Sequence, residues 1–154
     1  MQAKIPFSSV ALSFVFVAVA LAAPAIAQDR AHGGVKLSAT LNGASEVNTA
    51  GAPNQGDPDG SGAFSGRVNP GQRQVCYTLT WAGIVAPFAA HIHTGPAGVN
   101  GSVVVPLDIA PGEHCATVTR DLALDLITNP QDYYVNIHNS IYPAGAVRGQ
   151  LVKH

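Results

Sequence analysis

Two short motifs bring three histidines into what reads as one β-rich domain: His-Ile-His at residues 91–93 and Asn-Ile-His at residues 136–138. Because side chains alternate along a strand, His91 and His93 point to the same side of theirs. Their Cβ atoms then lie about 6–7 Å apart, within the span of two imidazole rings on one metal ion. A third histidine from another strand completes a ligand set for copper or zinc, and the affinity order of divalent metals favours copper. We therefore predict a metal site at His91, His93 and His138.

Two other interpretations of these histidines stay open. A half-exposed sandwich face is normally polar, so the side chains could instead hydrogen-bond the loop at residues 96–101 and hold the fold together. In the other interpretation they act as catalytic acids and bases. His32, His114 and His154 are weaker ligand candidates, and His32 and His154 lie near the ends of the mature chain.

The strands expected to carry the histidines have further polar side chains on the same side. On the strand that ends at His138, Asn136 shares its face, and on the last strand Arg148 shares a face with Gln150. These faces are expected to form one patch, with Asn136 and Arg148 surrounding the ligands. Arg148 is expected to pack its stem and hydrogen-bond a loop carbonyl, which is the common role of such a residue.

From residue 35 onward, short stretches of alternating apolar and polar side chains are separated by Gly, Pro, Asn and Asp. This spacing is typical of an all-β antiparallel sandwich. One helix is expected at residues 121–128, capped by Thr119 or Asp121 and ended by Asn129-Pro130. The expected strands are 35–41, 62–68, 74–81, 88–93, 102–107, 114–119, 133–138 and 146–152. The expected core residues are Val75, Tyr77, Leu79, Trp81, Ala116, Val118, Tyr133, Val135, Ile137, Val147 and Leu151.

The first 27 residues read as a secretory signal peptide. Lys4 supplies a positive start, residues 7–23 are almost wholly apolar, and the segment ends in Ala-Ile-Ala, with small residues at the cleavage positions. The alternative is an uncleaved membrane anchor, for which the apolar stretch is short. Residues 28–34 are expected to be a flexible N-terminus, and no later apolar run is long enough to span a membrane. The mature chain is therefore expected to be secreted or periplasmic.

The two cysteines, Cys76 and Cys115, both lie in the part expected to be exported. An even count in an oxidising compartment favours a disulfide bond. Each cysteine alternates with threonines, on the side of its strand opposite the core residues, so a cross-link between two strands at the surface is geometrically reasonable. Two separate thiols, or cysteines that bind metal, are the alternatives.

Residues 90–107, which begin Ala-His-Ile-His-Thr-Gly-Pro, closely resemble the central signature of the CHRD (chordin-type) domain family. Residues 134–138 and 143–151 resemble the end of the family pattern, and the Asp-Pro-Asp-Gly-Ser-Gly turn at residues 57–62 resembles an earlier part. The resemblance spans about residues 35–152. It implies an exported, immunoglobulin-like domain without a settled activity.

With this resemblance, residues 35–154 are expected to form one CHRD domain. Its expected fold is all-β, an immunoglobulin-like or Greek-key antiparallel β-sandwich with one short helix. One departure is Ala146, where the family usually has an acidic residue before the Val-Arg-Gly segment. This departure leaves open whether Arg148 has an ion-pair partner.

A weaker similarity links the chain to copper-zinc superoxide dismutases, which also carry His-x-His on a strand of a Greek-key sandwich. It implies that His91, His93 and His138 are copper ligands and that Arg148 guides an anion. The long zinc loop of those enzymes has no counterpart in residues 94–102. The similarity therefore implies a copper-only site rather than a full copper-zinc centre.

We predict an exported, non-enzymatic binding module that holds copper, or less readily zinc, through the three histidines, with no catalytic residue assigned. Its partner is a metal ion or an extracellular protein. The alternatives are a superoxide dismutase-like copper redox enzyme and a purely structural or adhesive extracellular domain. Without Lys4 the chain has 7 Lys and Arg against 9 Asp and Glu, a net charge of −2, and its basic residues are scattered. Nucleic acid is therefore not an expected partner.

Overall fold

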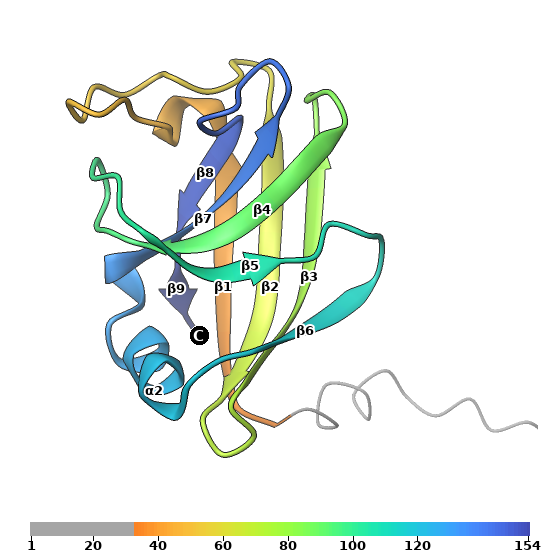
Figure 1. Cartoon of the computed structure of the whole chain (residues 1–154), viewed down its shortest axis with the longest axis vertical. Coiled ribbons are helices and arrows are strands. Elements are labelled where there is room, and N and C mark those ends of the chain that lie inside the picture. The colour runs from red at the N-terminus through yellow and green to blue at the C-terminus, as the bar shows by residue number, and fades with distance from the viewer. Residues whose placement is uncertain (1–32) are drawn as a thin grey trace, which may run out of the picture.

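The computed structural model describes residues 33–154, which contain nine β-strands, one α-helix and two 3-10 turns (Figure 1). The expected signal peptide, residues 1–27, and residues 28–32 of the expected flexible N-terminus lie outside the described residues. The elements in chain order are β1 (Val35–Asn42), η1 (Gly43–Ser45), β2 (Ser61–Asn69), β3 (Gln74–Ala82), β4 (Pro87–Thr94), β5 (Val103–Leu107), β6 (Glu113–Thr117), α2 (Arg120–Thr128), η2 (Pro130–Asp132), β7 (Tyr133–Asn139), β8 (Val147–Gln150) and β9 (Val152–Lys153). All eight expected strands are present, and the last is divided into β8 and β9 at Leu151.

The strands form one antiparallel sheet in the order β5-β4-β7-β8-β1-β2-β3-β6, with β9 paired to β1. The sheet narrows between β8 and β1, where Asn42 and Arg148 are the single pair in register. This junction divides the sheet into two layers, and Figure 1 shows β4 and β5 passing in front of β1, β2 and β3. The free edges β5 and β6 come close together, so the sheet is nearly closed. The predicted all-β antiparallel sandwich is confirmed.

The core lies between the two layers, and the period-2 pattern of the sequence identified it. Val75, Tyr77 and Leu79 of β3 are buried against Ile92 of β4 and other side chains of the facing layer. Trp81 is the exception in its row, since it is only half-buried and packs at the border of the core. Full burial of an apolar side chain such as Val, Leu or Ile contributes about 1.5–3 kcal/mol to the free energy of folding. The inward-facing rows of apolar side chains are therefore the main source of stability.

The short helix α2 has the boundaries that its sequence signals require. The backbone N–H of Leu122 donates to the Thr119 hydroxyl, so Thr119 is the N-cap. Ala123 and Leu126 face the core, and the helix ends before Asn129, ahead of a proline. Within residues 33–154 no helix has both the length and the apolar character needed to cross a membrane.

The outer face of β7 departs from expectation. The alternation of polar and apolar residues predicts a half-exposed face, but every residue of β7 is buried. Two connections cover this face, residues 43–60 after β1 and residues 95–102 after β4. Asn100 joins them, since its side-chain amide donates to the carbonyls of Val47 (3.0 Å) and Asn48 (3.1 Å). The prediction failed because the periodicity along a strand carries no information about the path of loops that are distant in the sequence.

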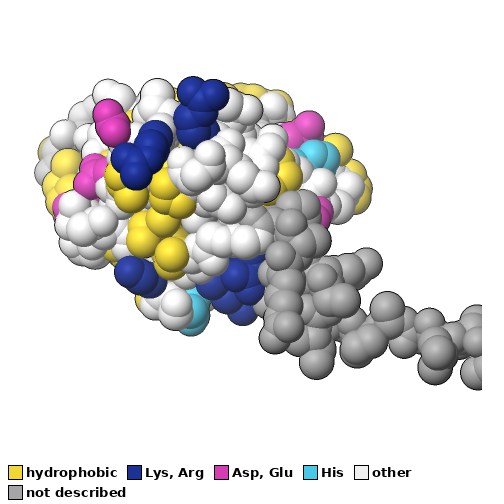
Figure 2. All heavy atoms as spheres, turned by 90° about the horizontal axis from the view of Figure 1, so that it is seen from below, with side chains coloured by type: hydrophobic (Ala, Val, Ile, Leu, Met, Phe, Trp, Pro, Cys, Tyr) yellow, Lys and Arg dark blue, Asp and Glu magenta, His cyan; other side chains and the backbone are white. Residues whose placement is uncertain are grey.

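Three neighbouring strands of one layer, β5, β4 and β7, carry no charged side chain. Residues 74–107 and 133–147, which include all of β4, β5 and β7, contain no Asp, Glu, Lys or Arg. Figure 2 views the molecule from below the orientation of Figure 1 and shows Lys and Arg side chains around a band of hydrophobic ones. Any charge that acts on β4, β5 and β7 therefore comes from other elements of the fold.

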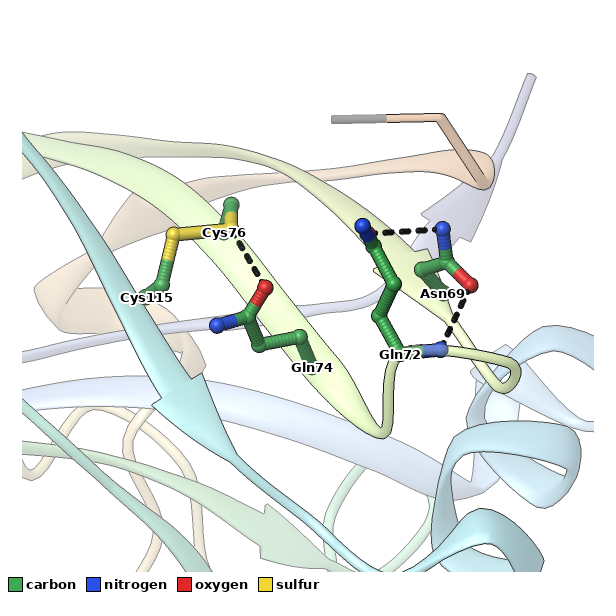
Figure 3. The surroundings of a disulfide bond; sticks show 5 residues. All are labelled: Asn69, Gln72, Gln74, Cys76 and Cys115. Atoms are coloured by element: carbon green, nitrogen blue, oxygen red, sulfur yellow. Dashed lines mark hydrogen bonds between the residues drawn. A yellow bond between two sulfur atoms is a disulfide. The ribbon is translucent and has the colours of Figure 1, made fainter. Parts of the chain in front are cut away.

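The predicted disulfide is confirmed. Cys76 of β3 and Cys115 of β6 lie directly opposite each other and are bonded, which ties the edge strand β6 to the sheet (Figure 3). The side chain of Gln74 lies against the Cys76 sulfur. Cys76 itself is buried, whereas Cys115 is exposed.

Removal of this cross-link is expected to destabilise the domain without changing its fold. The bond spans 39 residues of sequence, and the entropy of the opened chain predicts a loss of about 3–4 kcal/mol in the free energy of unfolding. Denaturant unfolding of a Cys76→Ala/Cys115→Ala variant measures the loss. The reduced natural protein should show a similar loss, and a change below about 1 kcal/mol would contradict the prediction.

Candidate metal centre

The structure brings the three predicted histidines together. His91 and His93 project from β4 and His138 projects from the neighbouring strand β7. One ring nitrogen of each lies within 4.8 Å of those of the other two. The ring centroids of His91 and His138 are 5.0 Å apart, and those of His91 and His93 are 5.4 Å apart. Such a group of nitrogen atoms can converge on one metal ion with small side-chain rotations.

Backbone carbonyls select the nitrogen atoms that remain available for a metal. The Nδ1 atom of His93 lies 2.9 Å from the Gly101 oxygen, and the Nδ1 atom of His138 lies 3.1 Å from the Pro143 oxygen. A carbonyl only accepts hydrogen bonds, so both Nδ1 atoms carry the proton and both Nε2 atoms keep a lone pair. A histidine that binds metal through one ring nitrogen usually donates a hydrogen bond from the other ring nitrogen in this way.

The two unprotonated Nε2 atoms differ in their contacts. The Nε2 atom of His93 is buried and has no hydrogen-bond partner. The Nε2 atom of His138 lies 3.1 Å from Nδ1 of His91 and, having no proton of its own, accepts a hydrogen bond from it. Nδ1 of His91 and Nε2 of the other two histidines can therefore serve one ion once the His91 proton moves to the other nitrogen of its ring.

The surroundings keep all three imidazoles neutral. Burial lowers the pKa of His91 below its usual value, and the neighbouring His138 and His93 lower it further. Burial also lowers the pKa of His138, against the opposing hydrogen bond to Pro143. For His93, burial lowers the pKa, the Gly101 hydrogen bond opposes it, and the positive charge of Arg148 lowers it again. Neutral imidazole is the form that binds a metal.

Tyr134 holds the ring of His93 in place. The two rings are stacked with centroids 4.8 Å apart and planes 9° from parallel. The Tyr134 hydroxyl also accepts a hydrogen bond from the N–H of Gly101 (3.3 Å), the residue whose carbonyl binds His93. The guanidinium of Arg148, from the strand on the other side of β7, stacks 3.4 Å from the Tyr134 ring centroid. His93 is thus fixed both at its ring face and at its Nδ1 atom.

Arg148 is buried beneath the β4–β5 connection. It is only 1% exposed, which argues against the anion-guiding interpretation. Its guanidinium donates to the carbonyls of Val99 (2.7 Å) and Pro96 (3.2 Å) and to the side chain of Asn100 (3.0 Å). The predicted hydrogen bond to a loop carbonyl is confirmed. The β4–β5 connection that supplies the Gly101 carbonyl therefore rests on Arg148.

A bulge in β4 brings an aromatic side chain to the site. Phe88 has the same parity as the core residue Ile92, but the register shifts between Pro87 and Ala89. Phe88 is consequently 60% exposed and stacks on the His138 ring, with centroids 6.3 Å apart. Bulges commonly redirect a side chain in this way.

The sequence did not indicate the role of Glu46. This carboxyl group lies in the loop after η1 and is 3% exposed. Burial raises its pKa to about 7, although the positive charge of Arg148 and hydrogen bonding with Asn136 and Val47 lower it in part. Glu46 thus supplies a charge that faces Arg148, in a fold where Ala146 replaces the acidic residue usual before this arginine. The available signal was its isolation in the sequence, since Glu46 is the one Asp or Glu in residues 30–56.

The weaker ligand candidates lie elsewhere. His114 binds the Ala110 carbonyl (2.9 Å) and lies 3.6 Å from Asp108, and His154 lies 2.6 Å from the Ser38 hydroxyl. His32 lies outside the described residues. In residues 33–154 the cluster of His91, His93 and His138 is the group of three or more potential ligands that meets the distance requirement.

The CHRD domain model matches residues 37–151, which include both histidine motifs. The chain belongs to the CHRD domain family. No curated protein and no solved structure matches the chain. Membership in this family supports a binding module and agrees with the resemblance seen in the sequence.

Replacement of Arg148 is expected to loosen the loop over the site. Arg148→Leu removes three hydrogen bonds to residues 96–100 and leaves the buried Glu46 without its positive partner, so the free energy of unfolding should fall by about 3 kcal/mol. Hydrogen exchange at residues 95–102 should accelerate as well. Arg120→Leu, at the exposed start of α2, is the matched control and should change stability by less than about 0.5 kcal/mol. Equal stability of the two variants would show that Arg148 does not anchor the loop.

Glu46 predicts a pH dependence of stability. Its pKa in the folded protein, about 7, lies above the ordinary value of 4.5. The folded state therefore binds the proton more tightly, and the Glu46 contribution is complete below pH 4.5 and is lost as the pH rises to about 7. The size of this contribution is about 3 kcal/mol. Urea unfolding from pH 4 to 8 should show this decline in the natural protein relative to Glu46→Gln, and parallel curves would refute it.

Proposed function

We propose that this protein is an exported copper-binding module whose ligands are His91, His93 and His138. The observation that carries the proposal is the pair of carbonyl-held Nδ1 atoms, which leaves the Nε2 atoms of His93 and His138 unprotonated and, with a nitrogen of His91, within 4.8 Å of one another. Asn136 and Arg148 surround the ligands, the first through its contact with His93 and the second through Tyr134.

The donor set favours copper over zinc. Three imidazoles suit both metals, but structural zinc sites in proteins are closed by a fourth cysteine or histidine. The ligand cluster in residues 33–154 contains three histidines and no cysteine or carboxylate. With equal ligands, copper binds more tightly than zinc.

Export is supported by the covalent structure. The chain carries the Cys76–Cys115 disulfide, and disulfide bonds persist in oxidising compartments but are rare in the cytosol. The signal peptide proposed for residues 1–27 supplies the route, and the mature protein is secreted or periplasmic.

The two alternative functions fit the site less well. A dismutase-like enzyme benefits from an exposed cation that attracts the anionic substrate, whereas Arg148 is buried and bound to loop carbonyls. A purely structural or adhesive role accounts for His93, which binds Gly101, but not for His91, whose hydrogen bond is to another histidine. Metal binding accounts for all three.

Metal analysis and titration of the untagged, exported protein test the proposal. We expect close to one copper per chain, bound more tightly than zinc, and loss of that copper in a His91→Ala/His93→Ala/His138→Ala variant. His114→Ala, which removes a histidine outside the cluster, is the matched control and should retain the copper.

Circular dichroism checks that the triple variant keeps its fold. Removal of copper by a chelator should lower the melting temperature of the natural protein and leave that of the triple variant unchanged, because a ligand stabilises only the state that binds it. Equal copper binding by the natural protein and the triple variant would refute the site.

A further inference from the structure

The three histidines have no carboxylate among the groups that act on them directly. All three come from the two uncharged segments, residues 74–107 and 133–147. No carboxylate is among the groups that shift the pKa of any of the three. Arg148, which acts on His93, itself faces the carboxyl group of Glu46. A metal ion here would be held by neutral ligands, with the opposite charges of Arg148 and Glu46 offsetting each other behind them.

The rim of the site is apolar. In an antiparallel pair, residues directly opposite share a face, so Val103 lies beside His93 and Pro106 beside His91. Val103 is 47% exposed and Pro106 is exposed as well. Phe88 stacks on His138 and completes the rim. Side chains of this kind offer no further oxygen or nitrogen ligand.

We propose that this site, given that it binds copper at all, is selective for Cu(I) over Cu(II). A doubly charged ion loses more hydration free energy than a singly charged one when it leaves water, and here no anionic ligand compensates it. Cu(II) also prefers a tetragonal set of nitrogen and oxygen ligands, whereas Cu(I) accepts three donors.

The selectivity rests on the neutral surroundings as much as on the ligands, since three imidazoles alone serve either oxidation state. This separates the inference from the proposed function. A negative charge placed on the rim, without any change to the histidines, should shift the preference toward Cu(II).

Val103 is the position for this test, because it lies beside His93 and is exposed enough to accept a polar side chain. Val103→Glu adds the charge, and Val103→Gln adds a side chain of the same shape without it. Affinity for Cu(I) is measured by competition with bicinchoninate under argon, and affinity for Cu(II) by competition with glycine, on the exported protein.

The natural protein should bind Cu(I) at least about a hundredfold more tightly than Cu(II). Val103→Glu should reduce that ratio about tenfold, and Val103→Gln should leave it within about twofold of the natural protein. Equal affinities for the two ions in the natural protein, or the same ratio in both variants, would overturn the selectivity while the copper site stands. If neither Cu(I) nor Cu(II) binds the natural protein more tightly than it binds the His91→Ala/His93→Ala/His138→Ala variant, the proposed function is overturned as well.

Discussion

The burial of one guanidinium group determines how this domain presents its histidines. Removing the Arg148 charge from water costs several kcal/mol, and the fold offsets that cost with three hydrogen bonds to the β4–β5 connection, stacking on Tyr134 and the nearby Glu46. Each compensating group is thereby held where the charge requires it. The loop over β7 is ordered because it is the counterpart of a buried cation, and the Gly101 carbonyl that orients His93 belongs to that loop.

Tyr134 links Arg148 to His93, one of the proposed metal ligands. It contacts the guanidinium, the His93 ring and the Gly101 amide, so the positions of these three groups depend on one another. Polar groups joined in this way inside a protein specify a unique arrangement, because a shift of one leaves another unsatisfied. The same principle explains why Gln150 bonds the Gly95 carbonyl at the start of the loop. The outer face of the sheet thus acts as a second, polar core.

Sequence reasoning succeeded where a period of two residues carries the information. It found the strands, the inward rows, the cross-strand cysteines and the shared face of His91 and His93, all of which follow from alternation. It failed where distant segments decide the outcome. The polar face was expected to be half-exposed, and neither the loops that cover it nor the buried carboxyl of Glu46 follows from a local pattern. Which ring nitrogen of His93 and of His138 keeps its lone pair depends on which backbone carbonyls the loops place beside the ring.

The three histidines are not held equally, and that difference matters for binding. His93 and His138 are each fixed by a carbonyl at Nδ1 and by an aromatic ring against the face, Tyr134 and Phe88 respectively. His91 contacts the rings of His138 and His93 but is not held by a backbone carbonyl in the described part of the chain, so it is the ligand that must adjust when an ion enters. Ordering one such side chain costs about 0.5–1.5 kcal/mol, against roughly three times as much for three free ones. The buried polar layer beneath the site therefore favours metal binding before any metal arrives, because the folding of the chain has already ordered two of its three ligands.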